Sequence, residues 1–267
     1  MKKFETLKKP LGVVVIVHGA MEHHGRYRWL TQKWNEAGYH VIMGDLPGQG
    51  LTERSNSGHV HSFVQYLTEV KKWVFEAYTY ELPVFILGHS MGGLIVIRLL
   101  EEGNYNLAGV ILSSPCVNLA HRPSAFLDSI SHILNIVNPK LRIESGVTPS
   151  LATRNREVIE ADAVDTLYVK KVSVRWFREL VSAMNTAFTR NEDFQDLPLL
   201  IMQGGDDRIV DKVAVKKWFH YCPANEKHYK EWPGLYHEIF NEPERDEVFT
   251  FARKFAESCL LGIGYDF

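Results

Sequence analysis

The sequence has few cysteines, no long apolar run and no excess of charge of one sign. Its three cysteines, Cys116, Cys222 and Cys259, are far apart and form no C-x-x-C pair. Neither a disulfide framework nor a zinc ribbon is therefore expected, and a reducing compartment fits. The 30 basic and 32 acidic side chains leave a formal charge of -2. Without a strong positive charge to attract a polyanion, nucleic acid is not an expected partner.

Signals for secretion or for crossing a membrane are not evident either. Residues 1–10 have the charges of a signal peptide, but Glu5 and Lys8 stand where its apolar stretch should be. The uncharged run 82–97 contains a proline and three glycines, and it is shorter than the roughly 20 residues that a bilayer span needs. A cytoplasmic location is expected, with the Lys-rich start as a solvated terminus or a transient contact with a membrane surface.

The composition is that of a globular protein, and the pattern along the chain alternates between strands and helices. With 267 residues, 45% hydrophobic and 23% charged, the chain can bury roughly three quarters of its unfolded surface. Short β-branched runs predict buried strands, and segments of helical periodicity separate them. This alternation is typical of an α/β protein with a mostly parallel sheet flanked by helices. The predicted strands cover 13–17, 39–43, 84–87, 107–112, 199–203 and 227–231, and the predicted helices lie near 27–37, 62–78, 94–100, 213–219 and from 244 onward.

One long block interrupts the alternation. Residues 118–193 contain no strand of comparable quality but two helical segments, 126–137 and 177–188. A block of this length is too long for a bare connection and should be structured. We therefore expect a core formed by 1–117 and 194–267, and a helical insertion at 118–193. The segment 126–137 could be an ordinary buried helix or a cap helix whose apolar residues face a site on the core.

The strongest chemical signal is Gly88-His89-Ser90-Met91-Gly92, a G-x-S-x-G sequence between a predicted strand and a predicted helix. This context predicts a nucleophile elbow that presents the Ser90 hydroxyl on a tight turn, where side chains at 88 and 92 would collide. The Met91 N–H, at the start of the helix, would then point to a developing oxyanion. A second donor is expected from the loop after the first strand, with Ala20 N–H as the candidate.

A serine hydroxyl needs a histidine as base and an acid to orient that histidine. His237 lies in a loop after the last predicted strand, whereas His220 falls on a helix and His228 inside a strand. Asp206 and Asp207 both follow the strand that ends at residue 203, at the edge of the sheet where such sites form. Local sequence does not separate these two aspartates.

Several motifs together resemble one family. They are His18-Gly19-Ala20-Met21-Glu22-His23-His24-Gly25-Arg26-Tyr27, Asp45-Leu46-Pro47-Gly48-Gln49-Gly50, Gly88-His89-Ser90-Met91-Gly92-Gly93, Gly205-Asp206-Asp207-Arg208 and Tyr236-His237-Glu238. The chain resembles the monoacylglycerol lipase and lysophospholipase family of α/β-hydrolases over nearly its whole length outside the insertion.

The resemblance implies the α/β-hydrolase fold with a helical cap at 118–193. It also implies a Ser90, Asp207 and His237 triad, which selects Asp207 over Asp206, and an oxyanion hole of Ala20 and Met91. Glu22 and Arg26 match family positions near the polar end of the substrate site. One departure concerns that end, because Phe240 stands where the mammalian monoacylglycerol lipases carry a histidine.

Other binding motifs are weaker. Gly48-Gln49-Gly50 begins like a dinucleotide fingerprint but lacks the third glycine and the following helix. The spacing of Glu22, His23, His24, His59 and His61 matches no metal site, so we read these histidines as solvated loop residues. Neither a metal nor a cofactor is expected.

The sequence thus predicts a serine carboxylic-ester hydrolase that cleaves a lipid-like ester with one acyl chain, a lysophospholipid or monoacylglycerol, through an acyl-enzyme. Two alternatives stay open. One is a small-molecule carboxylesterase or thioesterase with the same triad, and the other is a non-catalytic α/β-hydrolase-fold protein that binds a ligand. The sequence does not define the oligomeric state.

Overall fold

The computed structural model describes residues 1–52, 54–121 and 124–265. Its centre is a seven-stranded sheet in the order β1-β3-β2-β4-β5-β8-β9, in which every neighbouring pair is parallel except β1 and β3. The strands are β1 Lys2–Phe4, β2 Gly12–Val17, β3 Tyr39–Met43, β4 Val84–His89, β5 Gly109–Ser113, β8 Leu199–Gly204 and β9 Lys227–Trp232. The predicted α/β fold with a mostly parallel sheet is confirmed.

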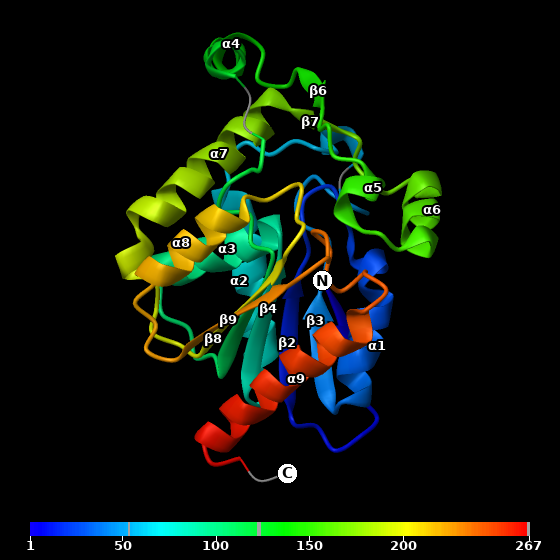
Figure 1. The fold of residues 1–267 in the computed structure, drawn as a ribbon, viewed down its shortest axis with the longest axis vertical. Helices are drawn as coiled ribbons and strands as arrows, with labels where there is room; N and C mark the ends of the chain where they lie inside the picture. Colours follow the sequence, from blue (N-terminus) through cyan, green and yellow to red (C-terminus); the bar gives the residue numbers. More distant parts are fainter. Residues whose placement is uncertain (53, 122–123, 266–267) are drawn as a thin grey trace.

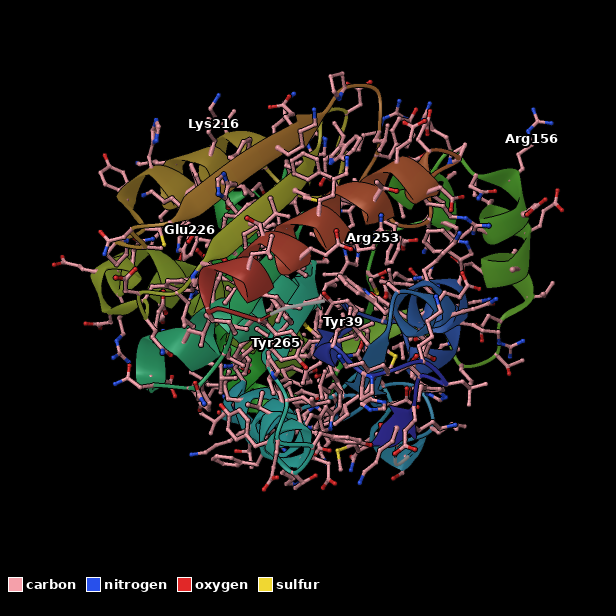
Figure 2. All side chains as sticks on the ribbon, turned by 90° about the horizontal axis from the view of Figure 1, so that it is seen from below. Tyr39, Arg156, Lys216, Glu226, Arg253 and Tyr265 are labelled. Carbon is pink, nitrogen blue, oxygen red and sulfur yellow. The ribbon has the colours of Figure 1, made fainter. Side chains whose placement is uncertain are left out.

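Helices cover both faces of this sheet. They are α1 Arg28–Glu36, α2 Val64–Tyr78, α3 Met91–Glu102, α8 Lys212–Tyr221 and α9 Arg245–Gly262, with short 3₁₀ turns at η1 His24–Tyr27, η2 Arg54–Asn56 and η3 Asn191–Asp193. Figure 2 shows α9, which carries Arg253, lying across the sheet, with Tyr265 just beyond its end, and Lys216 on α8 pointing outward.

The position of β2 in the sheet explains why its sequence is apolar without interruption. Successive side chains of a strand point to opposite faces, and both faces of this sheet are covered. Val13, Val15 and Val17 therefore lie in one hydrophobic cluster with residues of α2, α3 and α8. Val14 and Ile16 lie in a second cluster with residues of α1 and α9.

Two features at the edges of elements were not predicted. The lysine side chains near the start are exposed, as expected, but Lys2–Phe4 also form β1 and pair antiparallel with β3. Before α2, the Gln65 side chain accepts a hydrogen bond from Ser62 N (3.3 Å), and the Ser62 hydroxyl accepts one from Val64 N (3.3 Å). The helix α2 consequently begins at Val64, with Phe63 as its N-cap residue.

The block between β5 and β8 contains both helices and strands. It comprises α4 Ala125–Val137, β6 Arg142–Glu144, α5 Pro149–Ala152, α6 Arg156–Val164, β7 Lys171–Ser173 and α7 Val174–Thr189. Sequence analysis found the helices α4 and α7 but missed α5 and α6. It also missed the antiparallel pair β6–β7, whose strands are too short to show a pattern and whose partners are far apart in sequence.

This block lies above the carboxyl edge of the sheet (Figure 1). Its last helix is not separate from the core, because Trp176, Leu180, Ala183 and Met184 of α7 belong to the same hydrophobic cluster as Val13 and the other residues of that sheet face. At the far side, Arg156 on α6 points into solvent (Figure 2). Within the described residues, no helix has both the length and the apolar character needed to cross a bilayer.

Candidate active site

Ser90 stands on a strained turn between β4 and α3. Its φ of 53° and ψ of -119° are unusual for a residue with a side chain. The turn is held by hydrogen bonds from Ser90 N to Ser113 O (2.9 Å) and from Cys116 N to Ser90 O (3.0 Å). A Cβ at Gly92 would lie 2.1 Å from Val17 O, and one at Gly88 would lie 2.7 Å from Gly92 O. The glycines therefore allow the close backbone approach that exposes the Ser90 hydroxyl to the site.

The fold brings Ser90, His237 and Asp207 together in one chain of hydrogen bonds. His237 Nε2 lies 2.8 Å from Ser90 Oγ, and His237 Nδ1 lies 2.8 Å from Asp207 Oδ2. Because a carboxylate can only accept, Nδ1 carries the proton, which leaves the Nε2 lone pair to accept from the Ser90 hydroxyl. Asp206, the alternative acid, is exposed and lies outside this chain of contacts.

Asp207 is fixed in place by more than His237. Its Oδ1 accepts from the backbone N–H groups of Ile209 and Val210, both at 2.9 Å, and its Oδ2 accepts from Gln203 Nε2 at 2.8 Å. Gln203 is the last residue but one of β8, and it was not predicted from the sequence as a site residue. No local motif could have found it, because its role depends on where the Asp207 loop folds back.

Asp207 and His237 each shift the pKa of the other. Burial by itself would raise the pKa of Asp207, but the charge and hydrogen bond of His237 and the two N–H donors hold this pKa below its usual range. Burial likewise lowers the pKa of His237, yet the charge and hydrogen bond of Asp207 outweigh it and raise this pKa above its ordinary value. The imidazole can therefore accept a proton more readily than an isolated histidine.

Ala20 and Met91, the expected oxyanion donors, both border the cavity at Ser90. Met91 is the first residue of α3, and the first N–H groups of a helix have no acceptor within it. Ala20 lies in the loop after β2, next to Met21, whose φ of 66° marks a tight bend.

Ser90 opens into a cavity of about 530 Å³ between the sheet edge and the block above it. Most of its lining is apolar and comes from the loop after β2, the loop after β5, and the 119–180 region. These apolar residues include Met21, Leu119, Leu127, Ile130, Leu134, Ile143, Val147, Leu151, Trp176, Phe177 and Leu180. Such a lining suits an extended hydrocarbon group.

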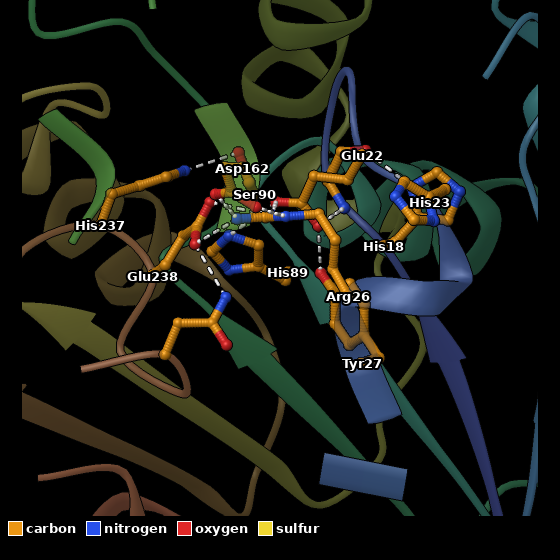
Figure 3. Close-up of polar contacts among 12 residues, drawn as sticks. His18, Glu22, His23, Arg26, Tyr27, His89, Ser90, Asp162, His237 and Glu238 are labelled. Carbon is orange, nitrogen blue, oxygen red and sulfur yellow. Dashed lines mark hydrogen bonds and ion pairs between the residues drawn. The ribbon is translucent and has the colours of Figure 1, made fainter. Parts of the chain in front are cut away.

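Arg26 does not reach the cavity, because three carboxylates surround it (Figure 3). Its guanidinium lies 3.1 Å from Glu22, donates to both oxygens of Glu238 at 3.1 and 2.9 Å, and donates through Nε to Asp162 at 2.8 Å. Glu22 does border the cavity, and its second oxygen accepts from the Tyr27 hydroxyl at 2.7 Å. The two residues expected at the polar end therefore bind each other, and Arg26 has no group left to bind a substrate.

Glu238 and Asp162 are parts of this cluster that sequence analysis did not predict. Glu238 directly follows His237, so its position could have suggested it. Asp162 comes from α6, 136 residues from Arg26, and carries no local signal. Behind the cluster, a space of only about 10 Å³ is bordered by Arg26, Phe240 and others. Phe240 is buried beside this space, which holds about one water molecule.

Three of the four loop histidines are not solvated as expected, whereas His61 is exposed as expected. His23 and His59 are buried, and His24 is half-buried. His23 Nε2 lies 2.6 Å from Asp165, His24 Nδ1 lies 2.7 Å from Asp45, and His59 Nδ1 lies 2.8 Å from Ser173. The sequence prediction was wrong for these three because the 163–173 segment and the loop after β3 fold over them.

Two groups of side chains have donor atoms close enough to share a metal ion. They are His23, His24 and Asp45, and Glu22, His89 and Glu238. In the first group, both ring nitrogens of His23 already have protein partners, Gly25 N and Asp165. In the second, Arg26 supplies the positive charge. Neither arrangement requires a metal to balance its charge.

The parallel sheet and the elbow serine, with histidine and aspartate on later loops, define the class of the α/β-hydrolases. Among known families, the one described as serine aminopeptidase, S33 (Hydrolase_4) matches residues 8–244. The chain belongs to this hydrolase family.

Two of the relatives are lipid hydrolases by name. A Bacillus subtilis protein named Phospholipase YtpA is 52% identical over 94% of this chain and 97% of the relative. A monoacylglycerol lipase of Mycolicibacterium smegmatis is 30% identical over 90% of this chain and 85% of the relative. The crystal structure of the Paleococcus ferrophilus monoacylglycerol lipase superposes with a TM-score of 0.86 at 29% identity, covering 97% of this chain and 98% of that one. The family and these similarities identify the chain as a serine ester hydrolase.

Proposed function

We propose that the protein cleaves a lipid ester with a single acyl chain, a lysophospholipid or a monoacylglycerol, with Ser90, His237 and Asp207 as its catalytic triad. The observation that carries this proposal is the hydrogen-bonded chain from Ser90 to Asp207 at the base of an apolar cavity of about 530 Å³. The names of the relatives, a phospholipase and monoacylglycerol lipases, support the substrate class.

In the first half of the reaction, Ser90 Oγ attacks the ester carbonyl while His237 Nε2 takes the hydroxyl proton. The N–H groups of Ala20 and Met91 stabilise the tetrahedral oxyanion. His237 then donates its proton to the oxygen of the leaving alcohol as the C–O bond breaks, which leaves an acyl group on Ser90. Asp207 holds the imidazole and stabilises the imidazolium that forms in this step.

In the second half, water attacks the acyl-enzyme with His237 again as the base, and Ser90 leaves with the proton returned. Burial holds the acyl chain, because each buried CH₂ contributes about 0.8 kcal/mol. Residues 118–193 act as a cap over Ser90 in this proposal, with Ile130 and Leu134 of α4 facing the cavity.

Exposed apolar side chains of α4 support a transient contact with a membrane surface. Phe126, Ile133, Ile136 and Val137 are 72%, 62%, 82% and 75% exposed, a concentration of apolar side chains on one cap helix. A cap that enters the lipid headgroup region with these side chains would place the cavity close to its substrate.

The substitution Ser90→Ala tests the triad. We expect it to abolish turnover of a p-nitrophenyl acyl ester and covalent labelling by a fluorophosphonate. A matched control is Ser131→Ala, because Ser131 borders the same cavity but lies on α4. Full activity of a folded Ser90→Ala protein would exclude the triad, and absence of labelling in the unmodified protein would instead favour a non-catalytic binding protein.

A series of lysophospholipids and monoacylglycerols of increasing acyl length tests the substrate. Activity that rises with acyl length supports the lipid esterase, because each CH₂ buried in the apolar cavity adds favourable binding free energy. Activity confined to short acyl or thioester substrates would favour the small-molecule carboxylesterase or thioesterase.

A further inference from the structure

Among the described residues, four charged side chains besides the histidines border the cavity at Ser90, and three of them are acidic. Glu22 and Glu238 are bound to Arg26, and Glu144 lies 3.4 Å from Lys171. The fourth, Arg208, is exposed and has no carboxylate partner within the described parts of the chain. Apart from the histidines, Arg208 is therefore the one cationic side chain of the described lining, and its charge is available to a substrate.

Arg208 is also held in a defined position. Its guanidinium carbon lies 4.1 Å from the centre of the Tyr236 ring, and Nη2 donates to the Tyr236 hydroxyl. Arg208 directly follows Asp207, and Tyr236 directly precedes His237. The two loops that carry the triad therefore fix the guanidinium relative to Ser90, which reduces the entropy that an arginine loses when it binds an anion.

We propose that Arg208 forms a subsite for the phosphodiester of a lysophospholipid head group, and that this contact favours phospholipid over glyceride substrates. The inference rests on the proposed function and narrows its substrate class. A planar guanidinium with free N–H donors binds phosphate oxygens in pairs, whereas the uncharged head of a monoacylglycerol forms no ion pair with it.

The other polar end of the site does not suit this head group. Glu22 and Glu238 present carboxylates there, which repel a phosphate. The space of about 10 Å³ behind them holds roughly one water molecule. A phosphate-bearing head group consequently has its favourable position at Arg208.

The test compares Arg208→Gln with the unmodified protein on three substrates: decanoyl lysophosphatidylcholine, monodecanoylglycerol and a p-nitrophenyl ester. Both lipids are assayed below their micelle concentrations, so that surface binding does not contribute. We expect kcat/KM for the lysophospholipid to fall about ten- to hundredfold, the effect of losing a hydrogen-bonded charge, mainly through KM. The other two substrates should change by less than about threefold.

Two further variants define the cause. Lys212→Gln removes a nearby cation that pairs with Glu231 and does not border the cavity at Ser90. This substitution should leave all three activities unchanged. Arg208→Lys should recover only part of the lysophospholipid activity, because an ammonium supplies the charge without the paired donors.

The outcomes are distinct. Equal losses on all three substrates would assign Arg208 a structural role and overturn the subsite, and so would unchanged lysophospholipid activity. An unmodified protein that cleaves the p-nitrophenyl ester but neither lipid would overturn the proposed substrate class, and the subsite with it. If the unmodified protein cleaves both lipids and Arg208→Gln does not lower the lysophospholipid activity more than the monoacylglycerol activity, only the subsite is overturned.

Discussion

The cluster around Arg26 connects three parts of the chain that sequence analysis treated separately. Glu22 comes from the loop of the expected oxyanion donor, Glu238 from the His237 loop, and Asp162 from α6. The Arg26 side chain is 5% exposed, and the three carboxylates are 5–6% exposed. Replacing Arg26 by Met would therefore leave three acids in a nearly dry site without their cation.

We expect Arg26→Met to lower the free energy of unfolding by about 3–5 kcal/mol, the cost of removing one partner from a buried ion pair. For a chain of this size, that corresponds to a fall in Tm of roughly 10 °C. The matched control is Arg253→Met on α9, where the pair with Glu257 at 3.6 Å is 39% and 34% exposed. An exposed pair at this spacing contributes only about 0.5 kcal/mol.

The loss should also depend on pH. In the intact protein, burial raises the pKa of Glu238, but the charge and hydrogen bonds of Arg26 outweigh it, so the pKa lies below its usual range. At Asp162 burial already outweighs Arg26, so this pKa is raised in the intact protein. Without Arg26, burial dominates at Glu238 as well, and the Glu238 pKa rises above its unfolded value. A raised folded-state pKa favours the folded protein at low pH and loses that effect as pH rises.

The free-energy deficit of Arg26→Met should therefore be larger at pH 8 than at pH 5. Urea unfolding of both variants and the intact protein at the two pH values measures it. A deficit below about 1 kcal/mol, or one that is the same at both pH values, would refute the view that Arg26 neutralises this cluster.

Two further predictions concern the triad and the cap. Asp207→Asn should lower kcat by about 10⁴-fold. It should also move the rise of activity to lower pH, because the Asp207 charge no longer raises the His237 pKa. pH–rate profiles measure both effects, and the control Asp206→Asn should leave the profile unchanged. The double variant Ile133→Ser/Ile136→Ser should weaken binding to phospholipid vesicles about tenfold through lost apolar burial. Sedimentation with vesicles measures it, and equal weakening by a Val213→Ser/Leu261→Ser control would show that α4 has no special role.

The elements of the core were predictable because their signals are local. The apolar run 13–17 predicted a strand buried on both faces, and β2 covers Gly12–Val17 with alternate side chains in two clusters. The spacing around Ser90 predicted a strand–turn–helix, and close backbone contacts at Gly88 and Gly92 are the physical reason for that spacing.

The sequence by itself therefore determined the α/β fold class, the elbow that presents Ser90, and the two loops that supply an acid and a histidine. Its family resemblance was needed to choose between Asp206 and Asp207. Only the tertiary structure decided what Arg26 does, because the carboxylates of Glu238 and Asp162 reach it from 212 and 136 residues away. Periodicity and motifs report on neighbours along the chain, whereas the charge balance of a buried cluster depends on which distant segments fold against it.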